Sequence, residues 1–535
     1  MVAPGTGQGG AGATPPVGSS DPIPPSSPGA EPPRRLSVTE YRNTVRDLLG
    51  GVVTTDDLPV DQQAGTSGFL TGAAITSAPD ARFLLDKAES ITTSVIPKLA
   101  ALVPCITTTT AGDDCARQFI AQFGRRAYRR PLVEEEVTRL FALYALQRTA
   151  DIGAPFSEAI RTVVIAMLQS PNFLYRWELG PNAPVRDGAL VRFNSHEVAS
   201  RLSYALWASM PDERLFQLAD KDALTTVEQI QAESRRMLAD PKADFAYADF
   251  ATQWLSLTQL PFALKDANYN FTPAMAQSML AETGAFVSDL FRGPKASGSF
   301  EALLTSRSSF IDGTLAAIYG VAGITGTALQ PVTFNANQRA GLLTQAAFLT
   351  KHGDTGGSFP VRRGAQIYRR LFCEEVELPL NLVVVAPPPA MPGQTTRQRF
   401  AEHSKNPCAF CHVLFEPLGF SFESYDGLGH YRTTDNGQPV DPTGSVHVGT
   451  DELTFTDAID LSSKLAKSDK VRDCFATQWM RFVLRRRETP GDLASIQSAQ
   501  KAFRASSFDM RELVVAISGS DVFSHRSPSE GEVLP

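Results

Sequence analysis

The feature that most constrains this chain is the pentapeptide Cys408-Ala409-Phe410-Cys411-His412. Two cysteines three residues apart, followed directly by a histidine, form the attachment pattern of c-type haem. At this spacing two thioethers hold the vinyl groups of the porphyrin along one helical turn, and the next side chain lies under the iron. The pattern therefore predicts one covalent haem c on Cys408 and Cys411, with His412 as the proximal iron ligand.

Pro417-Leu418-Gly419 follows the motif closely and supports the same prediction. In c-type cytochromes a proline carbonyl at this place often accepts the ring N–H of the proximal histidine, which fixes its tautomer. Two other interpretations of the cysteine pair stay open: a structural disulfide or free thiols, and half of a zinc site. Zinc has the weaker support, because no second CxxC or HxxxH lies at zinc-finger spacing.

A second cluster lies upstream, where His352 follows a predicted helix and enters a glycine-rich loop. A histidine presented by such a loop suits a distal iron ligand or an acid–base catalyst, so His352 is the candidate catalytic residue. Arg362 and Arg363 suit the haem propionates, because a guanidinium matches a carboxylate with two parallel hydrogen bonds. The competing interpretation of His352 is a cap at the helix C-terminus, which the helix dipole favours without any ligand.

Other polar residues near the motif carry less weight. His403 lies too close along the chain to the first cysteine to reach the far face of a porphyrin. Met480 follows the motif, in the order usual for a methionine-ligated cytochrome, but a methionine beside aromatic residues is more often part of a core. The flanking carboxylates suit loop hydrogen bonds at least as well as proton transfer. They are Glu416, Glu423 and Asp426.

The composition is that of an ordinary globular protein, with 43% hydrophobic and 20% charged residues among 535. This length has room for about two to four domains. The net charge of −7 and the lack of a basic run argue against nucleic acid as a partner. No run of about 18 apolar residues occurs, so the sequence predicts no transmembrane span. It also holds no GxSxG, P-loop or HExxH motif for hydrolase, nucleotide or metalloprotease chemistry.

Four cysteines lie outside the motif, and an even remainder fits two disulfides. We predict the pairs Cys105–Cys115 and Cys373–Cys474, the first closing a short loop and the second a long one. Disulfides and covalent haem attachment both belong to an oxidising compartment. We therefore expect a protein that is periplasmic, anchored at the outer membrane, or secreted.

Residues 1–33 consist almost wholly of Gly, Pro, Ala, Ser and Thr, and are too poor in apolar side chains to pack. This composition predicts a disordered tether. Such a tether is typical of a mature exported protein whose leader was trimmed. One class of such proteins is the lipoproteins, which carry a lipid anchor on the native N-terminus. The alternative is a disordered tail on a cytosolic protein.

Helical periodicity dominates the remaining sequence. Ser37 and Glu40 form a capping box at the start of a helix that Gly50 ends. Ser195 is expected to cap a helix as well. Further helices are expected at 80–103, 113–124, 226–239, 242–257, 273–292, 339–351, 457–467, 470–486 and 509–518. Strand signals are scarce until Asn436-Gly437, which predicts a tight hairpin near 430–445.

The predicted fold is mainly α, a multi-helical body with a c-type-cytochrome-like helical segment and this small β-hairpin. After the tether we expect four regions in chain order. They are an N-terminal helical region (34–185), a central helical domain (190–330), a haem-binding region (335–450) and a C-terminal helical region (451–535).

Five segments carry a resemblance to a known family: RRLSVTEYRNTVRDLLG, RRAYRRPLVEEEV, RLSYALWASMPDERL, residues 339–364 and CAFCHVLFEPLGFSFESYDGLGHYR. Together they cover most of residues 34–520. The chain resembles large, exported, mostly uncharacterised bacterial proteins built from consecutive domains of unknown function and regarded as cytochrome-c-like. The resemblance implies little about activity, because the family's chemistry is largely unassigned. One departure is His430, where the family pattern leads us to expect another residue, often arginine.

Two classes of function follow. The first is a haem redox protein, either an oxidative enzyme that uses oxygen or peroxide on an unknown substrate, or an electron-transfer cytochrome with a redox partner. We favour the enzyme, because a small cytochrome needs only about 100 residues and the larger helical body suits a substrate pocket or docking surface. The second class is a haem-free exported binding or scaffold protein whose CxxC forms a disulfide.

Overall fold

The computed structural model describes residues 34–50, 76–95, 112–176, 190–293, 296–376, 391–405, 408–448 and 451–528, with short pieces between them. The predicted tether, residues 1–33, lies outside the described residues. The described chain is mainly α-helical, as predicted, and its short strands pair in sheets of two or three. No helix in this part of the chain combines the length and the apolar composition that a bilayer span requires.

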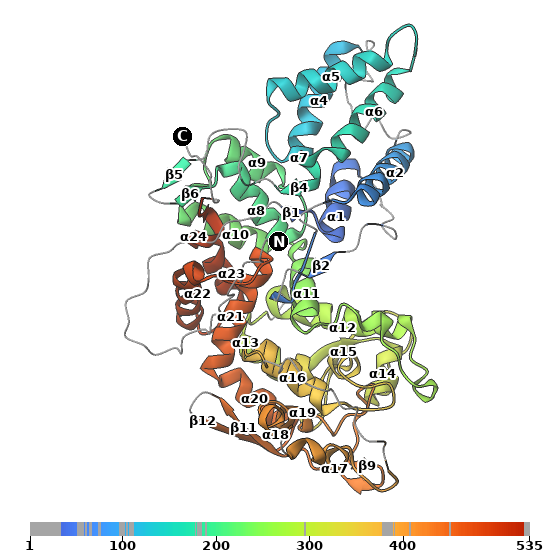
Figure 1. The fold of residues 1–535 in the computed structure, drawn as a ribbon, viewed down its shortest axis with the longest axis vertical. Coiled ribbons are helices and arrows are strands. Elements are labelled where there is room, and N and C mark those ends of the chain that lie inside the picture. Colours follow the sequence, from blue (N-terminus) through green and yellow to red (C-terminus); the bar gives the residue numbers. More distant parts are fainter. Residues whose placement is uncertain are drawn as a thin grey trace, which may run out of the picture.

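Hydrophobic side chains gather in two cores, and the first belongs to the N-terminal region. It is built from α1 (Val38–Leu49), α2 (Ala78–Val95), α4 (Asp113–Tyr128), α5 (Glu134–Gln147) and α6 (Phe156–Gln169). Figure 1 shows these helices as a lobe at one end of the molecule. Each is amphipathic, so its apolar stripe becomes buried only when the helices pack together.

The sequence determines both ends of α1. The Glu40 N–H donates to the Ser37 hydroxyl at 3.2 Å, and the Ser37 N–H donates to the Glu40 carboxylate at 2.8 Å. These two bonds confirm the predicted capping box. Gly50 then ends the helix with φ 64°, a left-handed conformation that glycine adopts without steric cost.

The second core extends over the rest of the described chain and takes side chains from all three later regions. At its aromatic centre Phe250 stacks on Trp479, with 3.9 Å between ring centroids, and Trp254 packs on Phe475 at 5.2 Å. Met480 is buried in this core, which agrees with the packing interpretation. The main helices are α8 (Ser195–Trp207), α9 (Glu213–Asp220), α10 (Val227–Leu238), α11 (Ala243–Trp254), α12 (Pro273–Arg292), α13 (Phe300–Thr305), α14 (Gly313–Tyr319), α16 (Pro360–Leu371), α20 (Ala458–Lys467), α21 (Asp469–Leu484), α22 (Leu493–Ala505) and α23 (Met510–Ser518).

The strands are short and antiparallel throughout the described chain. The pairs are β1 (Arg34–Arg35) with β4 (Tyr175–Arg176), β2 (Gln62–Gln63) with β3 (Leu70–Thr71), β7 (Ser308–Ile311) with β8 (Gln330–Thr333), β9 (Thr434–Asp435) with β10 (Gln438–Pro439), β11 (Gly444–Val448) with β12 (Asp451–Phe455), and β6 (Leu190–Arg192) between β5 (Val185–Asp187) and β13 (His525–Arg526). The turn between β9 and β10 has φ 48° at Asn436 and 82° at Gly437, which confirms the predicted hairpin.

Several predicted helix boundaries were wrong. The helix expected at 80–103 ends at Val95. The helix expected at 339–351 is instead a 3-10 turn, Leu342–Thr344, followed by α15 (Ala346–Lys351). Gly341 causes this break, because it has φ 61° and lies so close to Leu304 that a Cβ would meet the Leu304 carbonyl carbon at 2.2 Å. The N-cap of α8 is Asn194 rather than Ser195, and α22 was not predicted.

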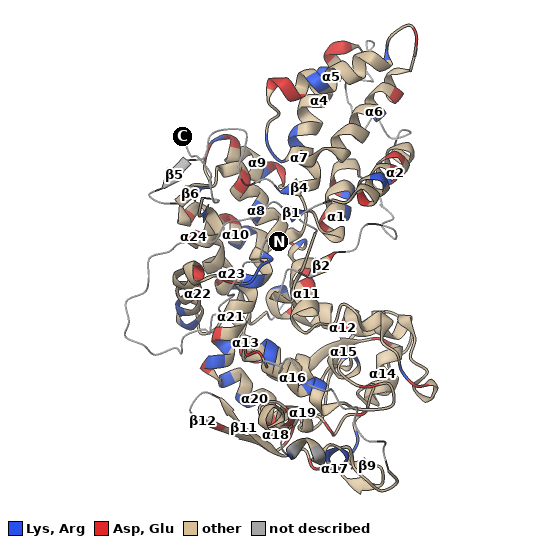
Figure 2. Cartoon of the chain, in the orientation of Figure 1, with Lys and Arg blue, Asp and Glu red and all other residues tan. Residues whose placement is uncertain are grey.

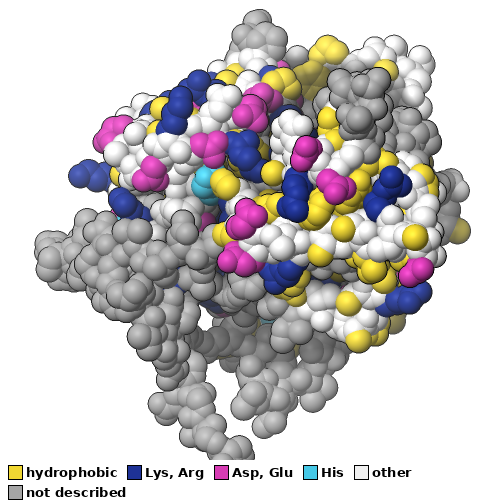
Figure 3. Space-filling view, turned by 90° about the horizontal axis from the view of Figure 1, so that it is seen from above, with side chains coloured by type: hydrophobic (Ala, Val, Ile, Leu, Met, Phe, Trp, Pro, Cys, Tyr) yellow, Lys and Arg dark blue, Asp and Glu magenta, His cyan; other side chains and the backbone are white. Residues whose placement is uncertain are grey.

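Charged residues of both signs are distributed along the described chain (Figure 2), and on the face seen in Figure 3 their side chains are interspersed with hydrophobic ones. Many of these charges are paired across short distances. Arg130 bonds Glu136 at 2.9 Å, and Arg486 bonds Asp492 at 2.6 Å. Such pairs connect the ends of neighbouring helices.

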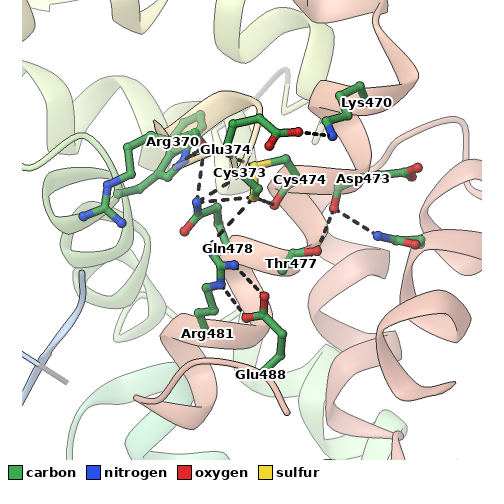
Figure 4. Close-up of a disulfide and its surroundings, with 12 residues drawn as sticks. Arg370, Cys373, Glu374, Lys470, Asp473, Cys474, Thr477, Gln478, Arg481 and Glu488 are labelled. Carbon is green, nitrogen blue, oxygen red and sulfur yellow. Dashed lines mark hydrogen bonds and ion pairs between the residues drawn. A yellow bond between two sulfur atoms is a disulfide. The ribbon is translucent and has the colours of Figure 1, made fainter. Parts of the chain in front are cut away.

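Both predicted disulfides are present. Cys105 and Cys115 are joined with 5.7 Å between their Cα atoms, and Cys373 and Cys474 with 5.5 Å. The second bond links the residues after α16 to α21 (Figure 4). Arg481 lies beside it and pairs with Glu488 at 2.6 Å. This disulfide therefore joins the segment before the CxxCH motif to α21, which lies after the motif in the chain.

Loss of the Cys373–Cys474 bond should destabilise the protein strongly. Because the bond spans 101 residues, the double substitution Cys373→Ser/Cys474→Ser should lower the free energy of unfolding by about 3–5 kcal/mol. The matched variant Cys105→Ser/Cys115→Ser opens a separation of only 10 residues and should cost about 2 kcal/mol less. Urea denaturation of both variants measures this difference, and equal losses would contradict the loop-closure argument.

Candidate functional site

The CxxCH motif lies on the surface, on the single helical turn α18 (Ala409–His412). The His412 N–H donates to the Cys408 carbonyl at 3.1 Å, which closes the turn. Residues three apart on a helix lie on the same side, so Cys408 and Cys411 are neighbours. Cys408 is exposed, Cys411 is half-buried, and both are free, in contrast to the four cysteines that form disulfides.

Large apolar side chains next to the two thiols are exposed to solvent. The exposed fraction is 84% for Phe410, 59% for Val413 and 37% for Leu414. Three such residues in one short segment form an apolar surface that a flat hydrophobic group would cover, and such surfaces mark binding sites. The residues present therefore fit a porphyrin joined to Cys408 and Cys411.

The His412 ring is held by Glu416, the first residue of α19 (Glu416–Phe420). The Nδ1 atom of His412 lies 2.9 Å from Oε1 of Glu416. A carboxylate only accepts hydrogen bonds, so Nδ1 carries the proton and Nε2 keeps its lone pair for a metal. The sequence predicts that this ring N–H donates to the carbonyl of Pro417. In the structure its partner is instead the side chain one residue earlier, because position i+4 on a helical segment faces His412.

His403 approaches the same carboxylate from a 3-10 turn, Ala401–Ser404. Its Nδ1 lies 2.6 Å from Oε1 of Glu416, and its ring centroid lies 4.3 Å from that of His412. Phe400 packs edge-on against the His403 ring at 5.2 Å. His403 therefore lies beside His412, not opposite it, and one buried carboxylate oxygen joins two imidazoles.

The position of Glu416 depends on close packing between α16 and α19. A Cβ atom on Gly364 would lie 1.9 Å from the Phe415 carbonyl oxygen, and one on Gly419 would lie 1.8 Å from the Pro360 carbonyl oxygen. The two backbones touch only because both positions are glycine. This contact fixes the start of α19, and with it the Glu416 carboxylate.

Arg363 holds the turn that follows α19. Its buried guanidinium donates to four carbonyls, those of Phe422 at 2.9 Å, Tyr425 at 3.0 Å, Asp426 at 2.6 Å and Leu349 at 3.1 Å. Burial lowers the pKa of Arg363 to about 10, so the group stays charged at neutral pH. Both terminal nitrogens are engaged in these bonds, and the predicted contact with haem propionates has no support from this arrangement.

Arg362 and His352 also have protein partners. Arg362 donates to the Gly353 carbonyl at 2.7 Å and lies over the Phe359 ring at 4.8 Å. His352 caps α15, is buried, and places Nε2 2.8 Å from the Leu255 carbonyl oxygen. Burial lowers the pKa of His352 to about 3, so its ring is neutral. These contacts agree with the capping interpretation, and the distal-ligand and catalytic roles of His352 stay predictions without structural support.

The remaining flanking residues form loop contacts. Nδ1 of His430 lies 2.8 Å from Oδ2 of Asp426, whose Oδ1 accepts the backbone N–H groups of Leu428 and His430. Glu423 is buried and accepts hydrogen bonds from Ser358 at 2.7 Å and from Arg432 at 3.0 Å. Asp426 and Glu423 thus have the loop role that the sequence allowed.

Comparison with family models divides the chain into five consecutive domains. All five families are described as proteins of unknown function. In chain order they are DUF1587 (residues 34–97), DUF1595 (115–178), DUF1592 (193–321), DUF1588 (339–435) and DUF1585 (451–523). The CxxCH motif and the His403–Glu416–His412 cluster both lie within the fourth match. No curated protein and no solved structure matched the chain.

The buried ring of His352 should make stability depend on pH. Its pKa is about 3 in the folded chain against 6.5 when exposed, so below pH 6.5 the unfolded chain binds a proton that the folded chain does not. Stability therefore falls as pH falls, by on the order of 2 kcal/mol at pH 5. In His352→Gln this component should disappear between pH 7 and 5, whereas in His447→Gln, at an exposed position, it should remain. Parallel pH profiles of urea unfolding for the two variants would contradict the assignment.

Proposed function

We propose that this chain, which contains five consecutive domains of unknown function, is an exported c-type haem protein with redox activity. One observation carries the proposal. The free thiols of Cys408 and Cys411 lie beside exposed apolar side chains, next to His412, whose Nε2 has a lone pair for a metal. Cys408 and Cys411 would hold the porphyrin covalently, and His412 would bind the iron through Nε2. When bound, haem supplies one-electron exchange and activation of oxygen or peroxide.

The contrast among the cysteines favours this proposal over a haem-free scaffold. Four cysteines are joined in two disulfides, while Cys408 and Cys411 lie next to each other on a helical turn without a disulfide between them. An unmodified thiol pair on the surface of an exported protein would be open to oxidation and mispairing. Attachment to haem removes both thiols and covers Phe410, Val413 and Leu414 at the same time.

The hydrogen bond from His412 to Glu416 favours an oxidative enzyme over an electron carrier. A carboxylate accepts the Nδ1 proton more strongly than a neutral carbonyl does, and so makes the imidazole a more basic ligand. A more basic ligand stabilises the oxidised iron and lowers the reduction potential. That property suits reaction with oxygen or peroxide. An electron-transfer cytochrome remains the alternative, with a redox partner in place of a small-molecule substrate.

The two disulfides support an oxidising compartment for the protein. Covalent haem attachment belongs to the same compartment. We therefore place the protein in the periplasm, at the outer membrane or outside the cell. A lipid anchor on the native N-terminus would agree with the Gly- and Pro-rich composition of residues 1–33.

Covalent attachment is tested by expression with c-type maturation machinery. The intact mass should exceed that of the polypeptide by one haem, and a pyridine haemochrome spectrum should show c-type haem. Cys411→Ala should abolish stable attachment, because only Cys408 is left to form a thioether bond to the haem. The matched variant Cys115→Ala removes a disulfide cysteine elsewhere and should keep the haem. An unmodified mass from a maturation-competent periplasm would contradict the proposal.

The role of Glu416 is tested by Glu416→Gln in the haem-loaded protein. The amide accepts the His412 proton more weakly, so the reduction potential should rise by about 100 mV, which corresponds to loss of one charge-assisted hydrogen bond. Glu452→Gln, an exposed position on β12, removes the same charge and should leave the potential nearly unchanged. Equal potentials in the two variants would favour the electron carrier.

A further inference from the structure

Three metal-ligating side chains converge beside the CxxCH motif. The donor atoms of His403, His412 and Glu416 all lie within 4.8 Å of one another. Both Nδ1 atoms point to the same carboxylate oxygen, at 2.6 Å and 2.9 Å. Around a tetrahedral zinc ion, ligand atoms lie about 3.3 Å apart, since each metal–ligand bond is about 2.0–2.1 Å. The two nitrogen–oxygen separations, 2.6 Å and 2.9 Å, therefore need to widen by less than about 1 Å to admit the ion.

We propose that, in the chain that carries no haem, His403, His412 and Glu416 form a binding site for one divalent transition-metal ion such as Zn²⁺. The ligands would be one oxygen of Glu416 and Nδ1 of each histidine, after the ring proton has moved from Nδ1 to Nε2, so that metal binding replaces the two hydrogen bonds to Glu416. Two imidazoles and one carboxylate, with a fourth position left for water, are a known donor set for zinc.

The site is preorganised on its buried side and open on the other. Glu416 has only 4% of its side chain exposed and is fixed by the α16–α19 contact, and His403 is packed against Phe400. The side chains of His403 and His412 are 16% and 23% exposed, so solvent reaches the metal position. Rigid ligands lose little freedom on binding, which raises affinity.

The donor atoms also restrict which ion binds. Imidazole nitrogen suits Zn²⁺, Co²⁺, Ni²⁺ and Cu²⁺, whereas Ca²⁺ and Mg²⁺ require oxygen ligands. The thiols of Cys408 and Cys411 do not belong to the convergent group. A nitrogen–oxygen site and a thiolate site are therefore distinguishable by spectroscopy.

This site is independent of the proposed haem function. The metal uses Nδ1 of His412, whereas haem iron would use Nε2 of the same ring, with Nδ1 still bonded to Glu416. The metal is thus a ligand of the haem-free chain, in which His403, His412 and Glu416 already lie together. Failure of either proposal leaves the other untouched.

The test uses the full chain expressed without maturation machinery, so that no haem is attached. Calorimetric titration with Zn²⁺ should give one site per chain, and Co²⁺ should give the visible absorption bands of a four- or five-coordinate nitrogen–oxygen site. His403→Ala should weaken Zn²⁺ binding at least tenfold. His447→Ala, an exposed histidine on β11 outside the cluster, should bind as the wild type does.

Two further variants keep the test decisive. Cys408→Ser/Cys411→Ser should retain Zn²⁺ affinity and the Co²⁺ bands, because the thiols are not ligands. Glu416→Gln gives a second way to weaken the site, and circular dichroism shows that each variant is folded. The proposal is overturned if the wild type shows no saturable Zn²⁺ binding, if His403→Ala binds normally, or if the double cysteine variant loses the metal.

Discussion

The contact between α16 and α19 underlies the whole candidate site. Two glycines, Gly364 and Gly419, let the backbones of these helices touch, and any side chain at either place would displace one helix. Arg363 then binds the turn after α19 through four carbonyls. The buried half of the site is therefore rigid, because both a steric contact and a charged network of hydrogen bonds would have to break for it to move.

On this rigid support the chain presents one short, exposed turn. The α18 segment, with its N-cap Cys408, carries both free thiols and exposed apolar side chains. Its histidine, His412, is hydrogen-bonded to the buried carboxylate of Glu416. The division is chemically useful. In the proposed function, the solvent-facing residues would hold the haem, and the buried carboxylate of Glu416 would control the tautomer and basicity of His412.

Several buried polar residues outside this segment bond to the protein itself. Arg363, His352 and Glu423 all have the burial and charge that suggest function, yet each satisfies groups of the protein itself. Burial moves the pKa values of all three, Glu423 upward and the other two downward, because the low dielectric disfavours a charge.

The sequence by itself determined the helical class, the α1 capping box, the β9–β10 hairpin and the number of disulfides. The helical class, the capping box and the hairpin depend on local spacing, because local backbone preferences are readable along the chain. The even number of remaining cysteines indicates two disulfides but not their partners, and the structure confirms the predicted pairs. It also located the CxxCH segment, since that motif is contiguous. Only the tertiary structure decided what surrounds the motif. His403 reaches Glu416 from a separate 3-10 turn, Ala401–Ser404. Glu416 is placed by a helix contact at Gly364, which lies 52 residues earlier in the sequence. Those positions follow from packing between distant segments, which no local pattern encodes.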